Sequence, residues 1–227
     1  MNSFRKIILS SGPYPIVGGN YMNEGYIAVL DKISSISPTP GGGAVAALAL
    51  GHSYSLVSMV SQLTLKSDKW IKGHKISKNL KNISEKGILH SIDLANNDCI
   101  AFDNVMNSYR LPKNNEEEIS IRKEKIIEAS LEATTAPYDI AEKSLDLLLL
   151  LPDFAKYANK NALTDLASAS QLAESAAYIA SLNVKINTPN LSKEDSRKYN
   201  IKIKNILKES KSLNENIQEI CSSRIGW

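Results

Sequence analysis

The sequence predicts an all-α protein, a single domain built as a bundle of roughly seven to nine helices. Apolar residues recur at helical spacing along most of its 227 residues. Two segments, residues 43–66 and 164–183, are dominated by small and aliphatic residues that favour helices. No segment alternates apolar and polar residues as a half-buried strand does, and no repeat of fixed length is present.

The composition is that of an ordinary soluble protein. Apolar residues make up 43% and charged residues 22% of the chain, which can therefore bury a substantial core. A net charge of +3 without a basic block argues against nucleic acid. Cys99 and Cys221 are far apart and are expected to be reduced thiols. The apolar run near the N-terminus is too short for a signal, and polar residues interrupt the run 44–60, so we expect a cytoplasmic protein without a membrane segment.

The first two helices follow an irregular N-terminal arm. Residues 1–23 carry Gly and Pro without a clear period. From Glu24, apolar residues at helical spacing predict a helix that Pro38 ends. The second helix, residues 43–66, is apolar or small on most faces and should be central. Gly51 lies inside it at a propensity cost of about 1 kcal/mol, so we expect a close packing contact there.

The middle of the chain predicts a long helix and at least two more. One apolar seam runs from Ile76 to Tyr109, until Pro112 ends it. Asn114-Asn115 followed by three glutamates has the pattern of a capped helix start. Pro137 predicts the first turn of a further helix, because proline is favoured there, and residues 145–151 form a buried run before Pro152.

The last third of the chain predicts two helices. Thr164-Asp165 opens, or lies early in, a helix rich in Ala and Ser that continues to Asn183. Residues 191–195 cap a final amphipathic helix whose polar face is rich in Lys, Glu and Asn. The long seam and the small-residue helix indicate that part of the apolar surface closes against a second copy, most simply as a two-fold dimer.

The most unusual segment is Ser37-Pro38-Thr39-Pro40-Gly41-Gly42-Gly43-Ala44, which we call the glycine bend. Two prolines and three glycines exclude a helix interior, and an Ala/Leu helix follows at once. Bare N–H groups at a helix N-terminus suit an electron-rich ligand. The spacing matches neither a dinucleotide-binding loop nor a P-loop. The alternative is a tight turn that lets a small-residue helix pack closely.

Three polar features lie on faces that should otherwise be apolar. Asp98 is on the seam side of the long helix, where a carboxylate must be paired or shifted in pKa. Asp165 begins the Ala/Ser helix, and Arg110 and Lys113 flank the end of the long helix. Helix dipoles alone would explain the last two features. The three histidines have no metal-ligand spacing, so we expect no metal, and no Gly-x-Ser-x-Gly motif supports a serine nucleophile.

Taken in order, several motifs resemble the formiminotetrahydrofolate cyclodeaminase/methenyltetrahydrofolate cyclohydrolase family. The resemblance covers roughly residues 24–190, and ordered motifs are more specific than any one of them. The matching segments are Pro38-Thr39-Pro40-Gly41-Gly42-Gly43, then Asp98-x-x-Ala101-Phe102-Asp103 with Tyr109-Arg110-Leu111-Pro112-Lys113, Ala136-Pro137, Thr164-Asp165, and Leu182-Asn183-Val184-Lys185-Ile186-Asn187. One departure is Lys66-Ser67-Asp68-Lys69-Trp70, where many members carry a stronger basic cluster that would hold the folate glutamate tail.

The resemblance implies an all-helical homodimer that acts on a tetrahydrofolate derivative, with no metal and no cofactor beyond that substrate. It places the chain in one-carbon metabolism and histidine catabolism. Carried over residue by residue, it implies that Asp98 and Asp165 are the catalytic acid/base and electrostatic groups. It also implies that the substrate contacts Pro40, Gly41, Gly42, Gly43, Phe102, Arg110, Lys113 and Asn183.

The implied activity is the cyclodeaminase reaction, in which N10 of 5-formiminotetrahydrofolate attacks the formimino carbon and ammonia leaves. Two alternatives stay open. The first is methenyltetrahydrofolate cyclohydrolase on the same scaffold, which adds water to the same carbon. The second is a non-catalytic helical dimer that binds folate, favoured only by the thinned basic segment 66–70.

Overall fold

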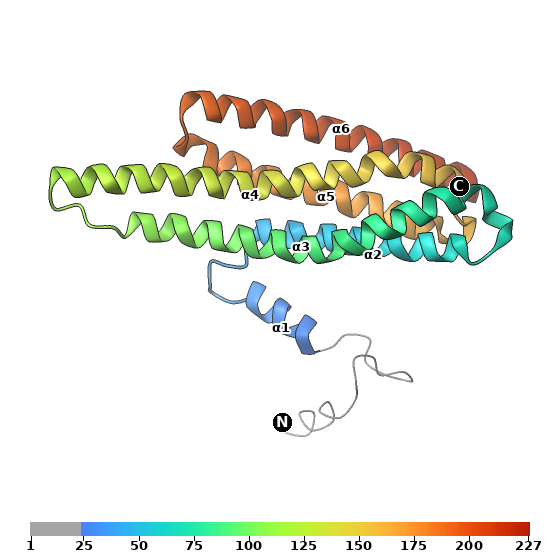
Figure 1. Ribbon diagram of the computed structural model, residues 1–227. Coiled ribbons are helices and arrows are strands. Elements are labelled where there is room, and N and C mark those ends of the chain that lie inside the picture. The colour runs from blue at the N-terminus through green and yellow to red at the C-terminus, as the bar shows by residue number, and fades with distance from the viewer. Residues whose placement is uncertain (1–23) are drawn as a thin grey trace, which may run out of the picture. The chain divides into compact units, whose positions relative to one another are not determined.

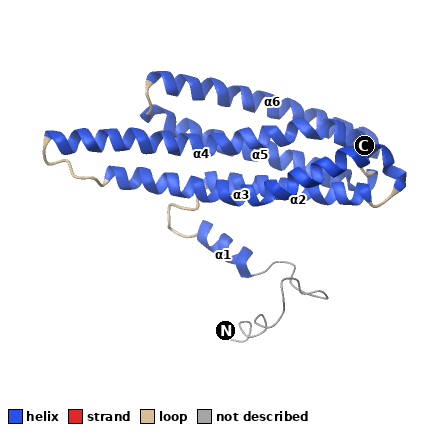
Figure 2. Cartoon of the chain, in the orientation of Figure 1, coloured by secondary structure: helices blue, strands red, loops and turns tan. Residues whose placement is uncertain are grey.

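The computed structural model describes residues 24–227, so the irregular arm predicted for residues 1–23 lies outside it. All regular structure in the described residues is helical, as predicted (Figure 2). The chain divides into two compact units, residues 1–37 and 38–227. Of the first unit, α1 (Glu24–Ile33) is described, a short helix whose Ile27 and Leu30 side chains are exposed.

The second unit is a bundle of long helices (Figure 1). Short 3₁₀ turns join several of them. α3 and α4 run past the ends of α5 and α6 and meet in a turn at the tip of a two-helix arm. The helices are α2 (Gly42–Leu65), α3 (His74–Tyr109), α4 (Glu116–Tyr157), α5 (Leu163–Asn187) and α6 (Lys193–Ile225).

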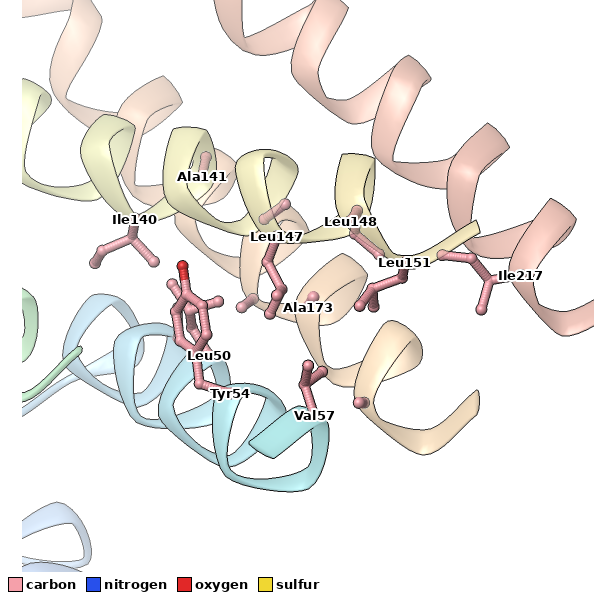
Figure 3. Packing of buried hydrophobic residues seen from close by; sticks show 14 of the residues in the cluster. Leu50, Tyr54, Val57, Ile140, Ala141, Leu147, Leu148, Leu151, Ala173 and Ile217 are labelled. Carbon is pink, nitrogen blue, oxygen red and sulfur yellow. The ribbon is translucent and has the colours of Figure 1, made fainter. Parts of the chain in front are cut away.

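α2 packs chiefly against α3 and α5, with a smaller contact to α4. Its Leu50, Tyr54 and Val57 side chains point toward α4 and α5, where Ile140 and Leu147 complete the core (Figure 3). The Ser53 hydroxyl donates to the Ala169 carbonyl oxygen of α5 at 2.7 Å. These contacts bury the inner face of α2 and fix its height against α5.

Two glycines let α2 and α3 approach closely. A Cβ at Gly51 would lie 3.2 Å from the Ser91 Cβ, which confirms the predicted packing contact. A Cβ at Gly87 would lie 2.6 Å from the Tyr54 ring, so only glycine fits there without rearrangement. Since Gly51 pairs with Ser91 and Tyr54 with Gly87, the two helices run antiparallel.

The predicted number of seven to nine helices is wrong for the described residues, which form six. The main reason is α4, a helix of 42 residues that continues through Pro137 and Pro152. A proline in a helix interior costs about 3 kcal/mol, partly because the carbonyl four residues earlier loses its donor. For Pro137 that carbonyl belongs to Ala133, and the Asn187 side-chain amide of α5 donates to it at 2.6 Å. This replacement donor, 54 residues away in sequence, lets the helix continue.

The outer face of α2 carries a second apolar stripe, formed by Val45, Leu48, Leu56, Met59 and Leu63. Met59 and Leu63 are 37% and 38% exposed, although they lie on the most apolar helix of the bundle. Among residues 24–227, α2 is the one helix long and apolar enough to cross a membrane, a test that the core helix of a soluble protein also passes. Of the 18-residue stretch of α2 that passes this test, 56% is buried inside the structure.

Candidate active site

The glycine bend and Asp98 meet at the N-terminus of α2. Gly41 is the N-cap of α2 and provides no side chain to satisfy the first N–H groups, and the first turn of the helix has no acidic residue of its own. The carboxyl group of Asp98, from α3, lies directly against Gly43. A Cβ at position 43 would lie 2.5 Å from the Asp98 Cγ, closer than real contacts allow. Glycine at 43 is therefore the condition for the carboxylate to reach this helix end.

Asp98 acts as the missing N-terminal anion of α2. The Ala44 backbone N–H donates a hydrogen bond to its carboxylate, which by itself lowers the pKa of Asp98. Burial is the larger effect and raises the pKa of Asp98 from 3.8 to about 6. A carboxyl group with that pKa can both accept and release a proton near neutral pH.

α5 forms a further wall of this region. A Cβ at Gly42 would lie 3.7 Å from Asn183 Nδ2 and 3.9 Å from Ile179 Cγ2, so both side chains flank the bend. The Asn183 amide donates to the Ile179 carbonyl oxygen at 3.1 Å, which orients its oxygen away from its own helix backbone. The predicted contact residues Gly42 and Asn183 are thus neighbours.

Pro40 belongs to the bend itself, and Phe102 lies on α3 close to Asp98 in sequence. Pro40 is half-buried, precedes the N-cap and follows a cis peptide bond. Phe102 is one helical turn beyond Asp98 on α3 and is 37% exposed. Its ring is therefore on the same side of α3 as the carboxylate, about 6 Å further along the helix axis.

Asp165, the second predicted carboxylate, lies elsewhere in the same chain. It is half-buried in the first turn of α5. Asn183, which flanks the bend, is 18 residues further along α5, about 27 Å along the helix axis. One chain therefore does not bring Asp98 and Asp165 together. The reason is that α5 runs antiparallel to α2, which places its N-terminus at the opposite end of the bundle from the bend.

The predicted cations are also distant within one chain. Arg110 is the C-cap of α3, and its guanidinium donates to the Asn107 side-chain oxygen at 3.2 Å. It lies 12 residues from Asp98, about 18 Å along α3. Lys113 is exposed in the turn at the tip of the α3–α4 arm. Neither cation reaches the bend of its own chain.

Segment 66–70, where the sequence differs from the basic cluster of the family pattern, lies at the end of α2 opposite the bend. Ser67 caps the short 3₁₀ helix Asp68–Gly73. The Trp70 ring has the Lys69 ammonium 5.0 Å and the Arg224 guanidinium 6.0 Å from its centroid. In this chain Trp70 thus joins the last turn of α6 to the end of α2.

Two features of the site escaped the sequence analysis. One is the hydrogen bond from the Ala44 N–H to Asp98: the sequence predicts bare N–H groups at this helix end, but not that a carboxylate of the same chain accepts from one of them. The other is Ile179, which helical spacing from Asn183 places on the same face of α5 and could have indicated. Among residues 24–227 no group of three His, Cys, Asp or Glu side chains could hold a metal ion.

The chain matches proteins of one family along most of its length. The sequence profile of the formiminotransferase-cyclodeaminase family matches residues 26–219. A methenyltetrahydrofolate cyclohydrolase of Methylorubrum extorquens is 33% identical over 208 residues, 90% of this chain and 99% of that protein. The formimidoyltransferase-cyclodeaminase of Rattus norvegicus is 29% identical over 82% of this chain, which spans only 34% of the rat protein.

A solved structure has the same fold. The formiminotetrahydrofolate cyclodeaminase of Thermotoga maritima is 25% identical, with a TM-score of 0.78 over 91% of this chain and 98% of that one. The family match covers α2 to α5 in full and therefore includes the glycine bend and Asp98. The chain accordingly belongs to the formiminotransferase-cyclodeaminase family of folate one-carbon enzymes.

Proposed function

We propose that this protein is a methenyltetrahydrofolate cyclohydrolase, which opens the methenyl bridge between two folate nitrogens by adding water. The observation that carries the proposal is the half-buried carboxyl group of Asp98, with a pKa of about 6, held against the N-terminus of α2. The choice of the hydrolytic reaction rests on the Methylorubrum extorquens protein, which this chain matches over 99% of that protein's length.

The chemistry suits a carboxyl group that ionises near pH 6. The methenyl carbon is part of a cationic system between two nitrogens, which an adjacent carboxylate stabilises. Ionised Asp98 would accept a proton as water attacks that carbon. The protonated acid would then give this proton to the departing nitrogen as one C–N bond breaks. The hydroxyl of the tetrahedral intermediate loses its own proton to solvent as the C=O bond forms, so that a formyl group remains on the other nitrogen and the reaction releases one proton. One group thus returns to its starting state in each cycle.

Asp165 would join this site from a second copy of the chain. Ser53 of α2 is level with Ala169 of α5, so Asp165, one turn earlier, is level with about residue 57. A two-fold axis crossing the outer face of α2 level with residue 50, between Leu48 and His52, would bring the partner's Asp165 level with Gly43. The outer apolar stripe of α2 would be buried by the same contact.

The cyclodeaminase reaction is the second candidate. It is favoured by the Thermotoga maritima structure, whose chain is covered to 98% by this one. In that reaction N10 attacks instead of water, and Asp98 would take its proton and return it to the departing ammonia. The same carboxyl group serves both reactions, because both pass through a tetrahedral carbon between two nitrogens.

An absorbance assay distinguishes the two reactions. The purified protein is incubated separately with 5,10-methenyltetrahydrofolate and with 5-formiminotetrahydrofolate, and the methenyl absorbance is followed. A cyclohydrolase makes it fall with the first substrate, and a cyclodeaminase makes it rise with the second. Activity with the second substrate alone would contradict the hydrolytic proposal.

Subunit mixing tests the shared site. The variants Asp98→Asn and Asp165→Asn are each expected to be inactive. In a mixed dimer one site carries both substitutions and the other none, so about a quarter of the wild-type activity should return on co-refolding. No recovery from a sample shown to contain mixed dimers would place both carboxylates in one chain's site, or Asp165 outside it.

A further inference from the structure

The outer face of α2 has a seven-residue period. Two rows of side chains recur on it: Val45, His52 and Met59, and Ala49, Leu56 and Leu63. α2 carries no Asp, Glu, Lys or Arg. A seven-residue period is typical of two helices that lie alongside each other at a crossing angle of about 20° and so stay in contact over several turns. The outer face of α2 therefore suits a second α2 running along it.

The two-fold axis proposed above crosses apolar side chains on the neighbouring helices as well. By the α2–α3 contacts, residue 50 of α2 is level with Ile92 of α3, which is 49% exposed and lies on the side of α3 turned away from α4. By the Ser53–Ala169 hydrogen bond it is level with Leu172 of α5. An axis chosen for the position of a carboxylate thus also brings two apolar side chains against their own copies.

The same two-fold operation places the partner's Met59 at the glycine bend. Met59 lies nine residues beyond residue 50, so its copy is level with Gly41, the N-cap of α2, nine residues before it. Nine residues are about 14 Å along the helix. At a crossing angle of about 20° two helices separate sideways by only about 5 Å over that distance, which a methionine side chain spans.

In the single chain both sides of this contact are accessible. Gly42 is exposed, and the Met59 side chain is 37% exposed. Asp98 approaches the bend from α3 and Asn183 approaches it from α5, so the outer side of α2 is the side from which a second copy can close it. A flexible thioether packs well against flat rings, and the ring system of the proposed substrate is flat.

We infer that the partner's Met59 forms the apolar cover of each active site and packs on the face of the folate ring system held at the bend. Each site then takes the carboxyl group of Asp98 from one chain and its cover from the other. This inference rests on the proposed function, because it uses the two-fold contact that brings the partner's Asp165 to the bend. It adds that the apolar contact between the copies also reaches the ligand.

Steady-state kinetics with 5,10-methenyltetrahydrofolate test the cover. Met59→Ala should raise KM about tenfold, because it removes an apolar contact with the ligand. Met59→Leu, which conserves the volume, should stay near the wild-type value. Leu48→Ala is the matched control, since it shortens a side chain on the same face of α2 but lies level with residue 52 of the other copy, away from the bend. It should leave KM unchanged.

Sedimentation at the assay concentrations establishes that each variant is dimeric when its kinetics are measured. Equal increases in KM for Met59→Ala and Leu48→Ala would show that a looser contact between the copies, and not a lost ligand contact, causes the effect. That result would overturn the inference, as would an unchanged KM in Met59→Ala.

Subunit mixing shows in which copy Met59 acts. Met59→Lys places an ammonium group beside a cationic substrate and should lower kcat/KM at least about 100-fold. In a mixed dimer of Met59→Lys and Asp98→Asn chains, one site carries both substitutions and the other none. About a quarter of the wild-type activity should therefore return on co-refolding. If Met59 acted in its own chain, neither site would be intact and no activity would return.

The mixture of Asp98→Asn with Asp165→Asn is measured beside this one, in samples shown to contain mixed dimers. Recovery with Asp165→Asn but not with Met59→Lys keeps the proposed shared site and overturns the cover. Recovery with Met59→Lys alone keeps the cover and removes Asp165 from the site. No recovery in either mixture overturns both. A Met59→Lys protein as active as the wild type also overturns the cover.

Discussion

Two polar sites in this bundle differ in how far their hydrogen-bonding needs are met. Asn214 of α6 is almost fully buried, and all its side-chain polar atoms are hydrogen-bonded. Its side-chain oxygen accepts from Ser170 and Gln218, and its amide nitrogen donates to Gln171 and Glu174. Asp98 of α3 accepts from the Ala44 N–H, yet burial still holds its pKa at about 6. The first arrangement satisfies its polar groups, and the second leaves a carboxylate in an unfavourable environment.

The difference indicates what each site is for. A satisfied buried network fixes the register of two helices and costs little. A carboxylate whose charged form is destabilised lowers stability at neutral pH and is retained where its chemistry is needed. A substitution at Asp98 should therefore lower activity without lowering stability, and a substitution at Asn214 should lower stability without lowering activity.

The largest effect is expected from Asp98→Asn. Removing a general acid/base should lower kcat by about 10²- to 10⁴-fold. The Asn side chain can still accept the Ala44 N–H, so circular dichroism and thermal melting should show a folded protein at least as stable as wild type at pH 7.5. An active variant, or an unfolded one, would contradict the role given to this carboxyl group.

Gly43→Ala should come next, because its Cβ would displace the Asp98 carboxyl group. We expect a loss of about 10²-fold in kcat/KM, measured by methenyl absorbance, since small displacements of a catalytic group are costly. Gly42→Ala is the comparison, as its Cβ would meet Asn183 at an ordinary contact distance of 3.7 Å. Equal losses in the two variants would show that the bend needs flexibility rather than space for Asp98.

Asn214→Ala should affect stability rather than chemistry. It leaves Ser170 and Glu174 with a lost partner, which should lower the free energy of unfolding by about 2 kcal/mol. Urea denaturation measures this, with Asn205→Ala, exposed on the same helix, as the control that should change little. A large loss of kcat in folded Asn214→Ala would show that Asn214 also serves catalysis, and the two sites would then not differ in role.

The smallest effect concerns the pH dependence of stability. The pKa of Asp98 is raised on folding, so between about pH 4 and 6 the folded protein binds more protons than the unfolded chain. This part of the stability is present below pH 4 and is lost as pH rises through 6. Relative to Asp98→Asn, the wild type should lose about 1 kcal/mol across that range, after allowance for partial exposure. Parallel stability curves would contradict the raised pKa.

The sequence was most informative where a local signal decides the structure. Asn115 and Ser192 cap α4 and α6 as their patterns predict, and the apolar seam marks α3 to its last residue, Tyr109. It was misleading at Pro137, because the donor that rescues the Ala133 carbonyl comes from Asn187 in another helix. A proline rule based on neighbouring residues cannot anticipate a partner supplied by the tertiary fold.

In the candidate site, too, one part could be predicted from the sequence and another part could not. The contact of Asp98 with the glycine bend agrees with the expectation that both belong to one site. The separation of Asp165, Arg110 and Lys113 from the bend could not be read from spacing, because it depends on the direction in which α5 and α3 pass α2. That Asp165 reaches the bend from a second copy is a prediction that subunit mixing can test.

The pH dependence of kcat for methenyl hydrolysis tests the central claim most directly. If Asp98 accepts the proton of the attacking water, kcat should fall tenfold per pH unit on the acid side, with a midpoint near pH 6 that matches its pKa. The residual activity of Asp98→Asn should lack this limb. A profile that is flat from pH 5 to 8, or a limb that persists unchanged in the variant, would show that another group carries the proton.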